Sequence, residues 1–242
     1  MTPLILGIET STLSCSVALF EGTELLHSAQ ALHEKYVHAS ELLPMIDLAF
    51  QKTKRNLNEL DAVAVCAGPG SYTGLRIGVS TAKGICHARN IPLIAINSLE
   101  IQAYGCPLEV SSVVAIMDAR RDEVYTQSFK RAGETWMPLD EIRAVILDDK
   151  QPLDVFFPEV SAEKACIIGD AAEKSERLLA DRADHWTFVS DHPQAKCMIQ
   201  PALEAFEAQR FEDVAYFTPR YLKEFVAGPP KDPLGLRKSQ IA

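Results

Sequence analysis

Close cysteine pairs, long apolar runs and an excess of positive charge are all absent from this 242-residue sequence. The nearest of its six cysteines, such as Cys66 and Cys86, are 20 residues apart, which excludes a CxxC zinc or redox motif. No apolar run approaches the roughly 20 residues that cross a bilayer. The first residues also lack the basic start and the apolar stretch of a signal peptide. These absences predict a reduced cytoplasmic protein that makes no contact with a membrane.

Acidic residues outnumber basic ones, with 33 Asp and Glu against 24 Lys and Arg, so the formal net charge is -9. Affinity for nucleic acid comes mostly from cations that neutralise phosphates. Any contact with RNA is therefore expected to be indirect, through a partner that supplies the basic surface. With 47% hydrophobic and 24% charged residues, the composition is that of a globular protein long enough to bury a core without disulfides.

The first part of the chain predicts a mixed sheet. Apolar runs at residues 4–9, 14–20 and 24–31 are separated by turn residues, which is typical of a three-stranded antiparallel meander. The further predicted elements are a helix at 40–54, a buried strand at 61–67, a helix at 75–88, a strand at 91–96 and a short helix at 98–104. A meander extended by strand–helix crossovers resembles the ribonuclease H-like architecture of actin-like ATPases.

Near residue 105 the order of predicted strands and helices starts again, and the rest of the chain is predicted to be a degenerate copy of the first part with fewer strands. The predicted elements are strands at 112–118 and 123–129, a turn at 133–136, a strand at 166–168, a helix at 171–182, a strand at 186–189 and a helix at 201–209. We therefore predict an actin-like subdomain over residues 1–105, a second one over 106–226 and a mobile tail over 227–242. A helix near 201–210 is expected to pack back on the first subdomain.

A glycine-rich loop, GPGSYTGLRIG at residues 68–78, lies between a predicted strand and a predicted helix. Backbone N–H groups that converge near a helix N-terminus favour an anion, which makes Gly70, Ser71 and Thr73 candidate phosphate contacts. The spacing matches neither the Walker loop nor GxGxxG. The alternative, a tight turn in which Thr73 caps the helix, stays open.

The end of the first strand supplies further candidates, Glu9, Thr10 and Ser11. Actin-like kinases keep Asp-x-Gly at this place, and here Glu9 replaces the Asp and a bulkier residue replaces the glycine, which hinders close approach to a phosphate. A plain strand end with hydroxyls capping a turn is the other interpretation. A small-molecule kinase or ATPase that uses Glu9 and the loop at 68–74 remains the alternative function. No HExxH motif or nucleophile–base pair supports a peptidase.

Several segments together resemble the TsaB (YeaZ) family: LGIETS at 6–11, GPGSYTGLRIG at 68–78, AKG at 82–84, MDARRDEVY at 117–125 and PRYL at 219–222. The resemblance implies a role in making threonylcarbamoyladenosine beside the tRNA anticodon. It implies a heterodimer with a TsaD-like transferase, joined by a TsaE-like ATPase. The apolar patch on the helices at 40–54 and 75–88 is expected to support a homodimer when the chain is alone, and the charge balance predicts only indirect contact with tRNA.

The same resemblance implies that the chain is not itself an enzyme. TsaD-like chains carry Asn-His-x-Glu-x-His, whose two histidines bind a metal, and the matching segment at 97–102 has Ser98 and Gln102 at those places. A hydroxyl and an amide are poor replacements for imidazole. We therefore expect no catalytic residue, no metal and no cofactor on the isolated chain, with a nucleotide bound, at most, at the partner interface.

The two helices at 40–54 and 75–88 are the predicted partner surface. The first is apolar on more than one face, and the second carries small residues that permit close helix packing. The predicted contact residues are Leu42, Leu43, Met45, Ile46, Ala49, Arg76, Val79, Ala82 and Lys83.

Overall fold

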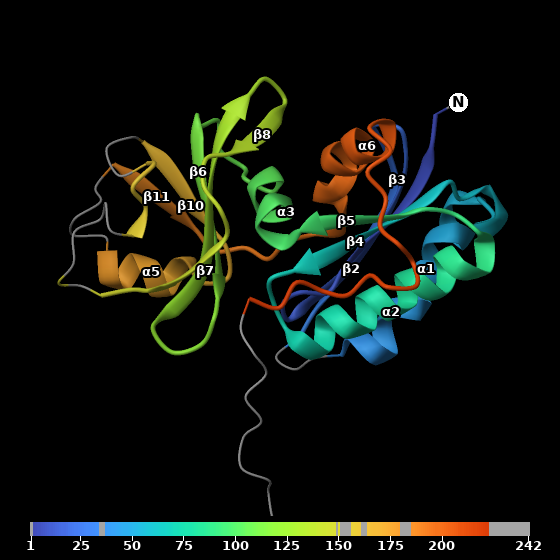
Figure 1. The fold of residues 1–242 in the computed structure, drawn as a ribbon, viewed down its shortest axis with the longest axis horizontal. Coiled ribbons are helices and arrows are strands. Elements are labelled where there is room, and N and C mark those ends of the chain that lie inside the picture. Colours follow the sequence, from blue (N-terminus) through green and yellow to red (C-terminus); the bar gives the residue numbers. More distant parts are fainter. Residues whose placement is uncertain are drawn as a thin grey trace, which may run out of the picture.

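The computed structural model describes residues 2–33, 37–148, 150, 156–160, 164–179 and 185–222, and its strands form two sheets (Figure 1). Residues 4–97 contain the strands of one sheet and residues 112–189 those of the other. The predicted fold class, two related α/β units each with a mixed sheet and flanking helices, is confirmed. The predicted tail over 227–242 lies outside the described residues.

Five strands build the first sheet: β1 (Leu4–Glu9), β2 (Ser14–Glu21), β3 (Glu24–Leu32), β4 (Ala62–Gly68) and β5 (Leu93–Asn97). Their order is β3-β2-β1-β4-β5. The first three are antiparallel, as the meander predicts, while β4 runs parallel to β1 and β5 parallel to β4. Every side chain of β1 and β4 is buried because both faces of the sheet are covered, and this explains their unbroken apolar runs.

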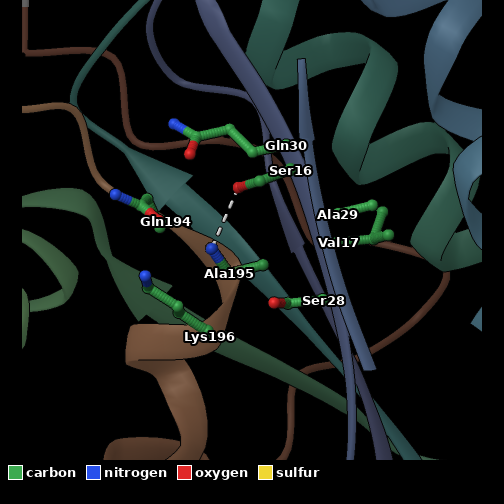
Figure 2. A pocket seen from close by; sticks show the side chains of 8 residues that line it. All are labelled: Ser16, Val17, Ser28, Ala29, Gln30, Gln194, Ala195 and Lys196. Carbon is green, nitrogen blue, oxygen red and sulfur yellow. Dashed lines mark hydrogen bonds between the residues drawn. The ribbon is translucent and has the colours of Figure 1, made fainter. Parts of the chain in front are cut away.

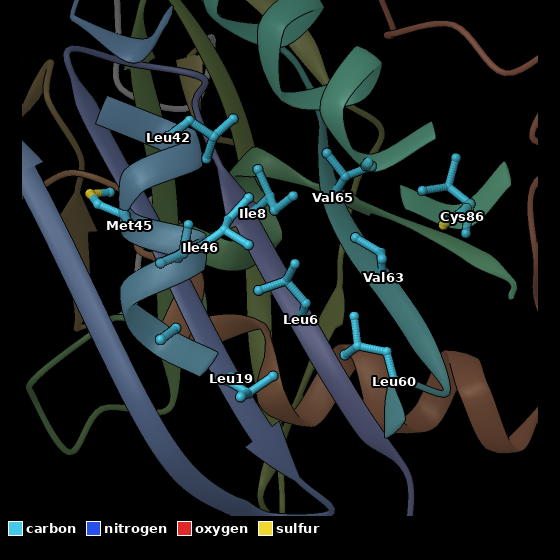
Figure 3. Close-up of a cluster of buried hydrophobic side chains, with 14 of the residues drawn as sticks. Leu6, Ile8, Leu19, Leu42, Met45, Ile46, Leu60, Val63, Val65 and Cys86 are labelled. Atoms are coloured by element: carbon cyan, nitrogen blue, oxygen red, sulfur yellow. The ribbon is translucent and has the colours of Figure 1, made fainter. Parts of the chain in front are cut away.

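Helices cover both faces of this sheet. On one face lie α1 (His38–Thr53) and α2 (Tyr72–Arg89), where Leu42 and Ile46 of α1 join the cluster that contains Leu6 and Ile8 of β1 (Figure 3). On the other face lie α3 (Ser98–Tyr104), the short 3-10 helix η3 (Ala195–Met198) and α6 (Ile199–Glu207). The chain therefore returns to the first sheet after it has built the second.

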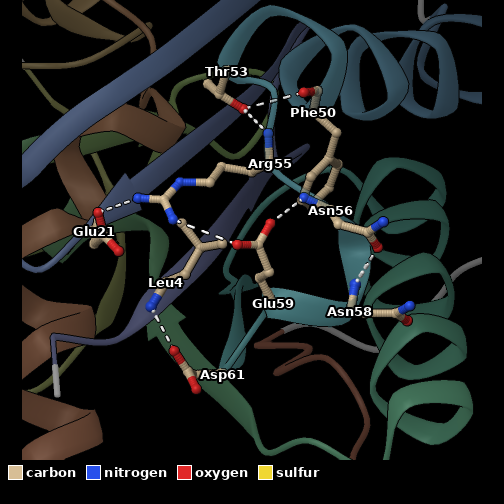
Figure 4. A network of polar contacts seen from close by, with 9 residues as sticks. All are labelled: Leu4, Glu21, Phe50, Thr53, Arg55, Asn56, Asn58, Glu59 and Asp61. Carbon is tan, nitrogen blue, oxygen red and sulfur yellow. Dashed lines mark hydrogen bonds and ion pairs between the residues drawn. The ribbon is translucent and has the colours of Figure 1, made fainter.

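A polar network holds the connection from α1 to β4 (Figure 4). Arg55 pairs with Glu21 and, at 3.6 Å, with Glu59. The short 3-10 helix η1 (Leu57–Glu59) starts with a capping box between Asn56 and Glu59, which satisfies two backbone N–H groups. Asp61 Oδ2 accepts a hydrogen bond from Leu4 N at 2.8 Å. These contacts fix where β4 enters beside β1, and so where the loop after β4 begins.

Six strands build the second sheet: β6 (Ser112–Asp118), β7 (Glu123–Ala132), β8 (Thr135–Pro138), β9 (Arg143–Ile146), β10 (Ala165–Ile168) and β11 (Trp186–Val189). The order is β11-β10-β6-β7-β8, with β9 also paired to β7, and it repeats the order of the first sheet. Helix α5 (Ala172–Leu179) follows β10. The prediction of fewer strands is wrong, because β8 and β9 are only four residues long and mostly not buried.

Helix α3 connects the two lobes. Its Ile101 belongs to the core of the first sheet, whereas Leu99 and Ala103 belong to a core cluster of the second sheet. Just before the helix, Asn97 Nδ2 donates a hydrogen bond to Gln127 Oε1 on β7 at 2.5 Å. No helix within the described ranges has both the length and the apolarity needed to cross a membrane.

Candidate functional site

The ends of β1 and β4 bring the two groups of candidate residues into one place. These strands are parallel neighbours, so their carboxyl ends meet at the same edge of the sheet. Ser71 N donates a hydrogen bond to Ser11 O at 2.6 Å, which joins the glycine loop to the turn after β1. Ser11 N in turn donates to Glu9 Oε1 at 2.5 Å. The two segments, recognised separately in the sequence, thus form a single edge site.

The glycines of the loop accommodate the protein's own backbone. A Cβ atom on Gly70 would overlap the carbonyl oxygen of Ser11, and one on Gly74 would overlap that of Thr10. A Cβ atom on Gly78 would overlap the Thr10 hydroxyl. The three glycines are therefore required by the close approach of residues 10 and 11 to the loop.

Helix α2 begins at this loop with a side-chain cap. Ser71 Oγ accepts a hydrogen bond from Gly74 N at 3.2 Å, and Ser71 is the residue before the first helical residue. The capping residue is therefore Ser71, and the prediction of Thr73 is wrong, because Thr73 lies within the first turn with its side chain exposed. The N–H groups of Ser71 and Gly74 are both used inside the chain, which leaves the loop a weaker anion site than its glycines suggest.

Glu9 is completely buried at the centre of the site. Burial raises its pKa to about 7, although hydrogen bonds from Ser11 and Cys66 act in the opposite direction. The Thr10 hydroxyl, which follows it in the turn, has no hydrogen-bond partner among the residues described. Glu9 is therefore a buried carboxyl group that is partly protonated at neutral pH.

The residues at the metal positions implied by the family resemblance do not fit a metal. Ser98 Oγ donates a hydrogen bond to Pro69 O at 2.5 Å, so this hydroxyl links α3 to the glycine loop. Gln102, one helical turn later, is buried, and its amide has no partner in the described part of the chain. In that same part, no group of three or more His, Cys, Asp and Glu side chains is arranged to hold an ion. We derive no chemistry through a metal here.

The equivalent edge of the second sheet is also closed by its own contacts. Asp118 N donates to Asp170 Oδ1 at 2.8 Å, and Lys174 Nζ donates to Asp118 Oδ1 at 2.6 Å. Burial raises the pKa of Asp170, opposed by the hydrogen bond from Asp118. A Cβ atom on Gly169 would overlap Ile116 O, so this glycine too is required by backbone packing.

A small pocket lies between β2, β3 and η3, and Ser16, which lines it, is the cross-strand partner of Glu9 (Figure 2). Its volume is about 210 Å³, and a hydrogen bond of 2.9 Å from Ala195 N to Ser16 Oγ crosses it. No candidate residue from the sequence lines it. Its lining residues are Ser16, Val17, Ser28, Ala29, Gln30, Gln194, Ala195 and Lys196.

Most of the predicted partner contacts face the protein's own core. Six of the nine residues are buried between the two helices and the first sheet: Leu42, Met45, Ile46, Ala49, Val79 and Ala82 (Figure 3). The prediction that these six residues form a docking surface is therefore wrong, because α1 and α2 need these side chains to pack on β1, β2 and β4. Leu43 is 61% exposed, and the sequence analysis missed Leu48, which is 41% exposed on the same helix.

The remaining two predicted contacts lie on α2. Arg76 is exposed, and its guanidinium lies over the Tyr72 ring, 4.2 Å from the ring centre. Lys83 is half-buried and donates to the carbonyl oxygens of Ala215 and Phe217 at 3.1 and 2.9 Å.

These carbonyls belong to a C-terminal strap, residues 210–222, that runs along α2 (Figure 1). Glu212 forms a β-bridge with Leu93, and Val214 and Phe217 pack against the core under α1 and α2. At its end, Arg220 N donates to Ala67 O at 2.8 Å, and the Tyr221 ring lies 4.7 Å from that of Tyr72. The strap was not expected from the sequence, although PRYL at 219–222 marks its end.

Two mixed sheets with the same strand order, joined through α3, make this chain a protein of the actin-like, two-subdomain α/β class. Comparison with known proteins agrees. The family model described as TsaD, tRNA N6-adenosine threonylcarbamoyltransferase, matches residues 32–227. The solved structure of YeaZ from Pseudomonas aeruginosa is similar over 91% of this chain and 100% of its own, with a TM-score of 0.78 and 25% identity.

Curated relatives carry the same name. A protein of Haemophilus influenzae named tRNA threonylcarbamoyladenosine biosynthesis protein TsaB is 37% identical over 123 residues, 50% of this chain and 51% of that protein. One of the same name from Buchnera aphidicola subsp. Schizaphis graminum is 30% identical over 185 residues, 73% and 83% of the two chains. The chain belongs to the TsaB (YeaZ) family. The match spans 51% to 62% of the Haemophilus influenzae, Escherichia coli and Buchnera aphidicola subsp. Acyrthosiphon pisum relatives' own length.

Proposed function

We propose that the chain is a non-catalytic accessory subunit in the threonylcarbamoyladenosine modification of tRNA. Family membership supports the pathway. The single observation that carries the accessory role is that the glycine loop is used internally: residues 10 and 11 pack directly against it, and the N–H groups of Ser71 and Gly74 donate within the chain. Ser98 and Gln102, an internal hydrogen-bond donor and a buried amide, support the same conclusion, since neither replaces a metal-binding histidine.

The proposed partner is a TsaD-like transferase, with which the chain forms a heterodimer that a TsaE-like ATPase joins. Leu43 and Leu48 support α1 as the contact helix, because two large apolar side chains exposed on one short helix are suited to an interface. Arg76, stacked on Tyr72, would lie at the rim of this contact. We propose that the same surface forms a homodimer when the transferase is absent.

The proposed complex binds tRNA through the partner, since the net charge of -9 opposes direct contact with phosphates. We also propose that any nucleotide binds where the two proteins meet and not on the isolated chain, because the loop's N–H groups on Ser71 and Gly74 already have acceptors.

Reconstitution tests this proposal. Purified transferase, TsaE-like ATPase, threonylcarbamoyl adenylate and unmodified tRNA are incubated with and without this chain, and modified adenosine is measured by mass spectrometry of nucleosides. We expect modification to depend on this chain and the chain alone to modify nothing. Full modification without it, or ATP hydrolysis well above background by the purified chain alone, would overturn the accessory role.

A further inference from the structure

The pocket between β2, β3 and η3 is walled by polar side chains on one face of the first sheet. Ser16, Ser28 and Gln30 lie on the strand side, and Gln194 and Lys196 lie on the side of η3 (Figure 2). Its volume of about 210 Å³ is below the roughly 300–1,000 Å³ of pockets that take drug-sized ligands. A ligand of this pocket would therefore have only a few non-hydrogen atoms.

Two buried serines replace apolar residues on this face of β2. Phe20 of the same face joins the core under α6, whereas Ser14 and Ser16 are 0% and 2% exposed. A buried hydroxyl needs hydrogen bonds, since burial of an unpaired one costs free energy. Ser14 Oγ accepts a hydrogen bond from Gln30 Nε2 at 2.9 Å, and Ser16 Oγ accepts one from Ala195 N at 2.9 Å. The Ser16 hydroxyl therefore keeps its own proton to donate, at a buried position in the pocket wall.

The two glutamines of the pocket supply acceptors. Gln30 donates through its amide nitrogen to Ser14, and the amide nitrogen of Gln194 lies 3.5 Å from each carboxylate oxygen of Asp191. Within the described part of the chain, neither amide oxygen receives a hydrogen bond. Each can therefore accept an N–H or O–H group of a ligand.

Lys196 gives the pocket a positive charge. Its side chain is exposed, and among the described residues its ammonium group has no ion pair or hydrogen bond. No acidic side chain lines the pocket, and Glu9, the cross-strand partner of Ser16, is fully buried. A carboxylate is the kind of group that a lysine ammonium binds by a charge-assisted hydrogen bond.

We propose that this pocket binds a small carboxylate with a neighbouring hydroxyl or amino group, that is, a hydroxy acid or an amino acid. The carboxylate would pair with Lys196 and accept the Ser16 proton, and the neighbouring group would donate to the amide oxygen of Gln30 or Gln194. The ligand would join β2 and β3 to η3, where the chain returns from the second sheet to the first. The proposal does not depend on the accessory function, which uses α1 and the glycine loop.

Nuclear magnetic resonance of the isotope-labelled full-length protein tests this proposal. L-Serine and L-lactate are added in steps, and the backbone N–H signals are followed. We expect saturable shifts concentrated at residues 28–30 and 194–196, and none there from potassium chloride at the ionic strength of the lactate samples. Acetate, a carboxylate without the neighbouring donor, should bind about three-fold more weakly or worse, because one hydrogen bond is lost.

A lysine variant tests the assigned role of the charge. Lys196→Ala should weaken the binding of both L-serine and L-lactate about ten-fold, because the charge-assisted hydrogen bond is lost. Lys130→Ala, at an exposed position of β7, is the matched control and should bind both like the wild type. Shifts that are absent or spread over the whole protein, acetate binding as tight as that of L-serine and L-lactate, or unchanged binding by Lys196→Ala would each overturn the proposal. Melting curves check that both variants fold.

Discussion

The Ser98 hydroxyl donates a hydrogen bond to the Pro69 carbonyl, 2.5 Å away, and so joins α3 to the glycine loop. The two residues are 29 positions apart in the sequence: Pro69 lies in the crossover from β4 to β5, and Ser98 begins the connection from β5 to the second sheet. In TsaD-like chains the family resemblance places a metal-binding histidine at this position. Here the side chain stabilises the fold, and this relationship leads to the first prediction.

Ser98→Ala should destabilise the protein, because it leaves a buried carbonyl oxygen without its donor. The expected loss is about 1–3 kcal/mol in the free energy of unfolding, measured by urea denaturation. Ser80→Ala, at an exposed position of α2, is the control and should change stability little. Equal stability of the Ser98 variant and the wild type would show that Pro69 finds another donor.

Two glycines of α2 should respond to alanine in opposite directions. Gly74→Ala places a Cβ atom onto the Thr10 carbonyl oxygen and should destabilise the protein strongly, with loss of the contact between the turn after β1 and the loop. Gly84→Ala meets no atom within 4 Å and should stabilise it by about 0.5–1 kcal/mol, since alanine favours the helix. Thermal melts of the two variants side by side test this. A harmless Gly74→Ala would mean that the loop is free to move away, and with it that a ligand has room.

Glu9 should make stability fall as pH rises. Its pKa is about 7 in the folded protein, against 4.5 for an unperturbed glutamate side chain, so the folded protein holds the proton more tightly. The stabilisation is full below pH 4.5 and is lost as pH rises through 7, by about 3 kcal/mol in total. Glu9→Gln keeps the shape and cannot ionise. Urea melts at a series of pH values should show the wild type losing stability relative to this variant over that window, and parallel curves would contradict the raised pKa.

Charge on the exposed face of α1 should abolish partner binding without unfolding the chain. Leu43→Glu with Leu48→Glu is expected to reduce capture of the transferase at least ten-fold and lower the melting temperature only slightly, because neither side chain belongs to the buried core. Ile146→Glu, 68% exposed on β9 of the other sheet, is the matched control and should bind normally. Undiminished capture by the double variant would place the contact elsewhere.

The sequence predicts the central strands well and the surfaces poorly. Residues 112–118 are a strand with the predicted bounds, because a buried central strand needs an unbroken apolar run. The apolar helix at 40–54 is also found, but periodicity does not say what covers an apolar side chain. Leu42 and Ala82 are covered by the first sheet and not by a partner.

The sequence predicts the candidate site with the same limit: it does not say which groups contact one another. The glycine spacing indicates a close approach to the loop, but it does not distinguish a phosphate from the carbonyls of Thr10 and Ser11, which lie far away in the sequence. The helix is capped by Ser71 and not by Thr73 because it starts at Tyr72. The local sequence pattern predicts the start of a helix only to within a residue or two. The strap at 210–222 forms no helix or strand of its own, so it has no periodic pattern and only its contacts with α2 reveal it.

The strap and the helices η3 and α6 have a consequence for biosynthesis. They cover one face of the first sheet and the side of α2, yet the whole second sheet is translated before them. On the ribosome, the earlier lobe would wait with exposed apolar strands while the later lobe is already complete. Folding of the first sheet is thus expected to be completed last, when its C-terminal covering elements have been translated. A chaperone has its longest opportunity to bind at this first lobe.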